Sequence, residues 1–215
     1  EIGSAVALAR ARETGDDAAI AHAIYARRLA IGITPDSGEQ QAEWSEAARR
    51  AERAGEIDLA LASLAWQAGD RLAASDMQGF DAAIADHARI AGGALHRTSA
   101  LSQIVWRGVR AIHEGRFDAA EGVIGEIPRR FEPPQVSFYA APALLAIRWH
   151  QGRLAEMLPR VRAISDAMPA LTIGHAWVAW ILAEEGDREA AAARIERVAG
   201  DDFDALARNP FWHLE

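Results

Sequence analysis

The residues of this sequence best suited to chemistry are its aromatic side chains and its histidines. Seven Trp and seven His occur among the 215 residues. A Trp offers a large flat apolar face with one hydrogen-bond donor, and a His can exchange a proton or ligate a metal. Their role depends on whether the fold gathers them at a surface or spreads them through a core.

The spacing of the histidines does not predict a metal site. His113 lacks the second His of a helical zinc motif, and His22, His87 and His96 stand alone. We interpret these histidines as structural or surface residues rather than as ligands.

Missing residue types exclude several reactions. The chain has no Cys, so thiolate nucleophiles, disulfides and Cys-based zinc sites are ruled out. All 23 basic residues are Arg, so there is no Lys for a Walker phosphate loop or a Schiff base. The acidic pair Glu184-Glu185 adjoins a Gly and predicts a solvated turn, not a catalytic pair. We predict no cofactor and no metal, and an all-helical enzyme is a remote alternative.

The charge of the chain argues against direct contact with nucleic acid. Its formal net charge is −8 and its pI is near 5.4. The pairs Arg27-Arg28 and Arg129-Arg130 are interpreted as solvated helix surface. The most apolar stretch, 170–183, is too short to cross a bilayer, and no basic-then-apolar leader is present. We therefore expect a cytoplasmic protein with no membrane contact.

The elements that must position the aromatic residues are helices joined by a recurring turn. An Ala-rich composition with few β-branched residues favours helix. Segments 115–120, 152–157 and 186–191 share a Gly followed by a helix start, and 79–83 matches after a one-residue deletion. The equivalent positions 80, 117, 154 and 188 are spaced by 37, 37 and 34 residues, which is typical of repeated helix pairs.

This pattern predicts five helix pairs and one leading helix. The leading helix covers 1–14, the pairs cover 17–54, 58–94, 97–130, 135–168 and 170–199, and a tail covers 200–215. Single helices are expected at 80–94, 118–130 and 154–168, among others. Gly115 is expected to be left-handed, and Asp118 to cap the next helix. Because the first helix has no mate and no Met precedes it, we expect 1–215 to be a single array from a longer protein.

The third pair resembles the tetratricopeptide repeat. Gly108, Ala111, Gly115 and Ala120 occupy the eighth, eleventh, fifteenth and twentieth positions of that pattern. The fourth and fifth pairs keep the Gly of the turn, but most signature aromatic residues are missing. The resemblance implies an all-α fold, a right-handed α-α superhelix of tetratricopeptide-like pairs.

The tetratricopeptide frame sorts the aromatic residues by position. Its groove positions include His113, Tyr139, Trp149, His150 and Trp180, which we predict as the ligand-binding or partner-binding residues. Together they could stack on a planar ligand or an aromatic side chain and bind its polar edge. Three other Trp fall on positions that pack between helices, namely Trp66, Trp106 and Trp177.

A narrower resemblance concerns runs such as 51–55, 114–117, 151–155 and 201–206. They are similar to the repeat region that follows the ATPase in large bacterial regulators. Those regulators carry LuxR-type or antibiotic-regulatory DNA-binding domains, or class III adenylate or guanylate cyclase domains. The resemblance implies a noncatalytic sensor arm that binds a small effector or another domain of the same polypeptide on its concave face. The alternative is a general scaffold that binds a protein or peptide partner.

Overall fold

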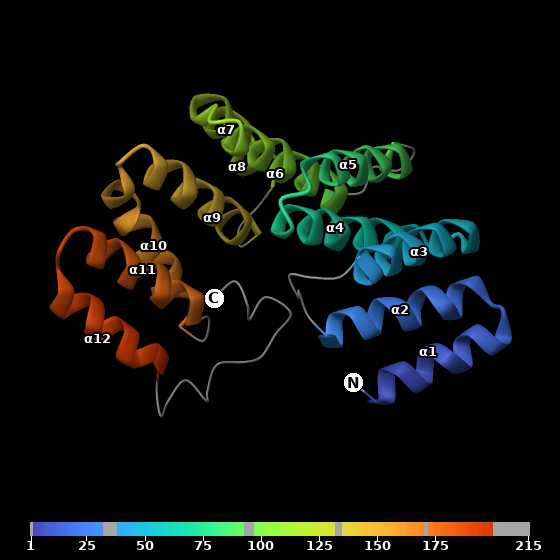
Figure 1. Cartoon of the computed structure of the whole chain (residues 1–215). Coiled ribbons are helices and arrows are strands. Elements are labelled where there is room, and N and C mark those ends of the chain that lie inside the picture. Colours follow the sequence, from blue (N-terminus) through green and yellow to red (C-terminus); the bar gives the residue numbers. More distant parts are fainter. Residues whose placement is uncertain (1, 32–37, 93–96, 132–134, 170–171, 200–215) are drawn as a thin grey trace. The chain divides into compact units, whose positions relative to one another are not determined.

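A computed structural model describes residues 2–31, 38–92, 97–131, 135–169 and 172–199. All regular secondary structure in these ranges is helical (Figure 1), which confirms the all-α prediction. Contacts divide the chain into two compact units, and the boundary falls between Gln103 and Ile104, inside a helix. Each unit has its own buried core.

The first unit is a succession of helices in which each one from α1 to α5 packs against the next. These are α1 (Ile2–Thr14), α2 (Asp17–Ile31), α3 (Gly38–Ala54), α4 (Ile57–Ala73) and α5 (Met77–Ala91), followed by the start of α6 (Arg97–His113). Half of the residues in its two core clusters are Ala: Ala21, Ala47, Ala51 and Ala60 beside Leu8, Ile20, Ile24 and Leu59. Small side chains let these helices approach closely.

The second unit continues from α6 into shorter helices. It contains α7 (Phe117–Ile124), α8 (Ile127–Arg130), α9 (Gln135–His150), the 3₁₀ helix η1 (Leu154–Met157), α10 (Leu158–Ala167), α11 (Thr172–Glu184) and α12 (Arg188–Ala199). Its core joins α9, η1, α10 and α11 through residues that include Leu145, Met157, Val161 and Ile181. Gly108 is needed where α6 meets α7, because a Cβ there would lie 2.5 Å from Ile124 Cδ1.

A left-handed residue ends the helix at each described turn of the repeating type. Gly115 has φ 70°, as predicted, and the same region is occupied by Gly15, Gly55, Ser75, Gly152 and Gly186. At Gly115 the next residue, Arg116, donates its N–H to the Ala111 carbonyl at 2.9 Å, a contact that recurs in the turns at residues 55, 75, 152 and 186. This hydrogen bond satisfies a carbonyl that the helix end leaves free.

Two predicted turn features are wrong. The segment 79–83 predicts a turn at Gly79 with the landmark at 80, but the left-handed residue is Ser75, and the Asp76 side chain accepts a hydrogen bond from the Gly79 N–H at 2.9 Å. Helix α5 therefore starts three residues before the predicted position 80. Asp118 is not a cap either, because Arg116 occupies that position and Asp118 lies in the first turn of α7. The negative charge of Asp118 still interacts favourably with the positive end of the helix dipole.

Two predicted helices are interrupted where a proline follows. The expected helix 118–130 ends at Ile124, and α8 begins at Ile127 with Pro128 in its first turn. The expected helix 154–168 opens as η1 before α10, which has Pro159 in its first turn. A proline has no N–H and disrupts a helix interior, so each one starts a new helix rather than continuing the old one.

Candidate binding surface

Two tryptophans meet at the surface of the second unit. Trp149 ends α9 and Trp180 lies in α11, and their rings make an edge contact with centroids 5.8 Å apart. Trp149 is 48% exposed, unusually high for so large an apolar side chain. Neither indole N–H forms a hydrogen bond in the described part of the chain. Both rings therefore keep a free donor beside an apolar face.

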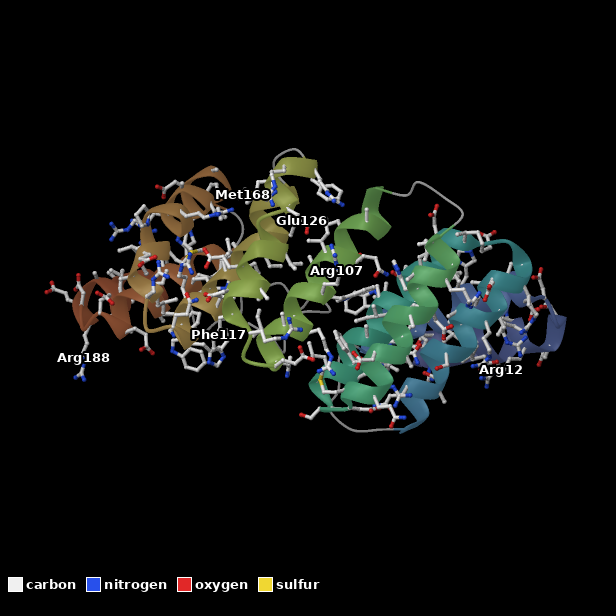
Figure 2. The ribbon with its side chains drawn as sticks, turned by 90° about the horizontal axis from the view of Figure 1, so that it is seen from above. Arg12, Arg107, Phe117, Glu126, Met168 and Arg188 are labelled. Carbon is white, nitrogen blue, oxygen red and sulfur yellow. The ribbon has the colours of Figure 1, made fainter. Side chains whose placement is uncertain are left out.

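Two further rings extend this contact. His150 lies 5.0 Å from Trp149 and stacks on Phe117 of α7 with a centroid distance of 5.3 Å. We call Phe117, Trp149, His150 and Trp180 the aromatic surface. Phe117 also borders an open depression of about 530 Å³, formed by the turn from α6 to α7 together with Gln151. Figure 2 shows Phe117 at the margin of the helical ribbon.

Helix α9 holds Trp149 outward by anchoring the residues next to it. Ile147 is fully buried, and Leu145 belongs to the core of the unit. Arg148 hydrogen-bonds Glu121 of α7 through both guanidinium NH groups, at 2.6 Å for Nη1 to Oε2, and contacts Glu156 of η1 at 3.4 Å. The hydrogen bonds from Arg148 lower the pKa of Glu121. This network fixes the end of α9 that carries Trp149 and His150.

Three of the five predicted binding residues are brought together: Trp149, His150 and Trp180. His113 ends α6 with an exposed side chain and makes no ring contact, hydrogen bond or ion pair with any other described residue. The side chain of Tyr139 lies outside the described residues. Sequence reasoning missed Phe117 as a binding residue, although it had marked this position as a repeat landmark two residues after the turn Gly.

The tryptophans of the first unit have a different environment. Trp44 is 1% exposed and donates its indole N–H to Asp70 Oδ2 at 2.8 Å. Arg28 Nη2 contacts the same oxygen at 3.1 Å, and its guanidinium carbon lies 5.5 Å from the centre of the Trp44 ring. Trp66 stacks on Trp44, with centroids 6.2 Å apart. We call Arg28, Trp44 and Asp70 the buried triad.

The buried triad corrects one interpretation of the sequence. Arg28 was expected on a solvated helix surface, but it is 1% exposed and paired with Asp70. This pairing could not be predicted from the sequence, because Asp70 is 42 residues away from Arg28. Burial raises the pKa of Asp70, and hydrogen bonds from Trp44 and the charge of Arg28 act in the opposite direction. An ion pair this deeply buried depends on both partners being present.

One Ser-His contact in the second unit pairs a hydroxyl with an imidazole, as a nucleophile and base would be paired. Ser165 Oγ lies 3.0 Å from His175 Nδ1, and Arg194 Nη1 lies 3.2 Å from the same nitrogen. An Arg can only donate, so this nitrogen accepts. Ser165 is 1% exposed and packs against Gly174, so a substrate could not reach its hydroxyl. The contact is a structural link between α10, α11 and α12.

Other kinds of site were sought among the described residues. These residues contain no group of three or more His, Asp or Glu side chains placed to hold a metal ion. None of the helices described combines the length and the apolar character needed to cross a membrane.

Comparison with known proteins gives no match. The sequence fits no protein-family model, and neither curated proteins nor solved structures show significant similarity to it.

Proposed function

We propose that this chain is a noncatalytic interaction module that binds a protein segment through its aromatic surface. The observation that carries the proposal is the pair Trp149 and Trp180, which present touching rings and unused N–H donors. Exposed Trp side chains with a free donor are enriched among the residues that dominate protein interfaces. The open position of Trp149 favours a peptide or domain over a small molecule enclosed in a pocket.

We also propose that the helices form a right-handed superhelix of tetratricopeptide-like pairs. It is supported by the recurring left-handed turn and its hydrogen bond, which are found in both units. A module of this type suits a sensor arm in a larger bacterial regulator, because each repeat contacts its neighbours and small rotations add along the array.

The expected ligand is a segment with an apolar or aromatic anchor. The ionised groups beside Phe117 are of both signs and partly neutralise one another, since Arg116 hydrogen-bonds Glu114 through its Nε at 2.7 Å. Charge therefore does not select the partner strongly here. An anchor side chain would stack on Trp149 or Trp180, and a carbonyl of the partner would accept from an indole N–H.

A peptide selection tests this function. A random dodecapeptide library is selected on the full chain, and enriched peptides are measured by calorimetry. Trp149→Ala should weaken their binding about tenfold or more, because it removes a large exposed ring of the site. Ile195→Ala is the matched control, since Ile195 is an exposed apolar residue of the same unit outside the aromatic surface. Equal binding to Trp149→Ala and wild type, or no enrichment at all, would contradict the proposal.

A further inference from the structure

A cleft in the first unit concentrates positive charge on an acidic chain. It has a volume of about 710 Å³ and is formed by α1, α2 and α3. We call it the basic cleft after its five arginines, Arg12, Arg27, Arg49, Arg50 and Arg53. Two Glu also line it, so its formal charge is five minus two, or +3, whereas the whole chain carries −8. Figure 2 shows nitrogen-bearing and oxygen-bearing side chains gathered around Arg12.

Four of the five guanidinium groups contact carboxylates, three of them closely and Arg12 at 3.2 Å. Arg27 pairs with Glu43, and Arg50 and Arg53 both hydrogen-bond Asp17, at 2.7 Å and 2.8 Å. The pKa of Asp17 is lowered to about 2, chiefly by its hydrogen bond from Arg53. These contacts fix the positions of the cations along the cleft, so little side-chain freedom is lost when a ligand binds.

The other two cations are available to a ligand. Arg49 is exposed and forms no hydrogen bond or ion pair with any described residue. Arg12 is half exposed and has one contact, with Glu46 Oε2 at 3.2 Å. Arg49 and Arg12 belong to α3 and α1, so the two groups approach the cleft from different helices. An isolated surface Arg needs no explanation, but the exposed Arg49 and the half-exposed Arg12 beside three closely held cations form a site for an anion.

The shape and chemistry of the basic cleft indicate the class of anion. A guanidinium donates two parallel hydrogen bonds to a phosphate, which makes Arg the preferred partner of this group. The lining also includes four apolar residues, Leu8, Ala5, Ala9 and Ala42. We propose that the basic cleft binds a small organic phosphate, with its phosphate between Arg49 and Arg12 and its apolar part on the alanines and Leu8. This goes beyond the interaction proposed above, since it uses another unit and another ligand.

Calorimetry of the full chain with phenyl phosphate tests the inference, and phenol serves as the ligand without the charge. Phenyl phosphate should bind and phenol should not. The affinity for phenyl phosphate should fall as salt is added, because the contacts are ionic. Binding of phenol as tight as that of phenyl phosphate, or no binding of phenyl phosphate, would overturn the proposal.

Three variants make the test specific. Arg49→Gln should weaken phenyl phosphate binding about tenfold, through loss of a charge-assisted contact. Arg10→Gln is the matched control, because Arg10 is an exposed Arg of α1 that also lacks a described partner and does not line the cleft. Glu46→Gln should tighten binding, since Glu46 holds Arg12 and Arg50. A gain cannot come from misfolding, so unchanged or weaker binding by Glu46→Gln refutes the inference, as does an equal loss for the two Arg variants.

Discussion

The two units use the same residue type in opposite ways. In the first unit Trp44 is enclosed, and Asp70 takes its N–H. In the second unit Trp149 is 48% exposed, and its N–H donates to none of the described residues. Both rings contact another Trp, so ring contacts alone do not distinguish a core from a site. The state of the indole N–H distinguishes them. A buried N–H without a partner is costly, so a core Trp needs an acceptor, whereas an exposed N–H is hydrated until a ligand accepts from it.

The largest effect is expected from breaking the buried triad. Asp70→Asn leaves the buried Arg28 cation without its opposite charge, which should lower the free energy of unfolding by about 3 kcal/mol. Urea denaturation followed by circular dichroism measures this loss. Asp166→Asn is the control, since Asp166 is exposed in α10 and has no described partner. Equal stabilities for the two variants would show that the triad is not a structural element.

A pair of identical substitutions compares the two environments of Trp directly. Trp44→Phe removes the donor to Asp70 and should lower the free energy of unfolding by about 1–3 kcal/mol. Trp149→Phe should change it by about 0.5 kcal/mol or less, because it alters an exposed position. The same denaturation experiment measures both. A greater loss for Trp149→Phe would reverse the assignment of core and surface.

A pH effect is expected from the first unit, where His87 is buried in α5. Burial lowers the pKa of His87 from 6.5 to about 4. As the pH falls, the unfolded chain therefore takes up this proton first, and the free energy of unfolding decreases between pH 6.5 and 4. Urea titrations at pH 7, 5.5 and 4.5 should show this decrease, and His87→Gln should remove most of it. If the free energy of unfolding of the variant fell with pH as steeply as that of the wild type, His87 would not be the source of the effect.

A small effect is expected from the network that holds Trp149. Arg148→Gln breaks the contacts with Glu121 and Glu156, which are partly exposed, so it should lower the free energy of unfolding by about 1 kcal/mol or less. The same substitution should also lower the binding affinity of the selected peptides about threefold, because Trp149 is then held less firmly. Calorimetry with Glu196→Gln, an exposed carboxylate change in the same unit, provides the control. Unchanged peptide affinity would show that Trp149 is placed by the core alone.

The sequence predicts local features of this protein well. Helical composition, the Gly turns and the spacing of Trp149, His150 and Trp180 all follow from periods of a few residues or one repeat. Turns without Gly are harder to predict. The left-handed residue before α5 is Ser75, and not the Gly of the segment 79–83. The second Pro-dependent start, at η1 and α10, was also missed, because the repeat spacing predicts one continuous helix over 154–168 and does not register Pro159.

Features that depend on distant partners could not be read from the sequence. Arg28 resembles any surface Arg until Asp70 is placed beside it by α4. The basic cleft likewise joins Arg12 of α1 to arginines of α3, more than thirty residues further along the chain. Whether a charged residue is buried in an ion pair or exposed depends on which side chains the neighbouring helices place beside it. No local sequence pattern contains that information.

The most direct test observes the indole groups themselves. With ¹⁵N-labelled Trp, each of the seven residues gives one side-chain N–H resonance, assigned by Trp→Phe variants. When a selected peptide is added, the signals of Trp149 and Trp180 should shift together, and that of Trp44 should stay in place because its N–H remains on Asp70. Shifts confined to Trp44 and Trp66, with Trp149 and Trp180 unchanged, would contradict the aromatic surface as the binding site.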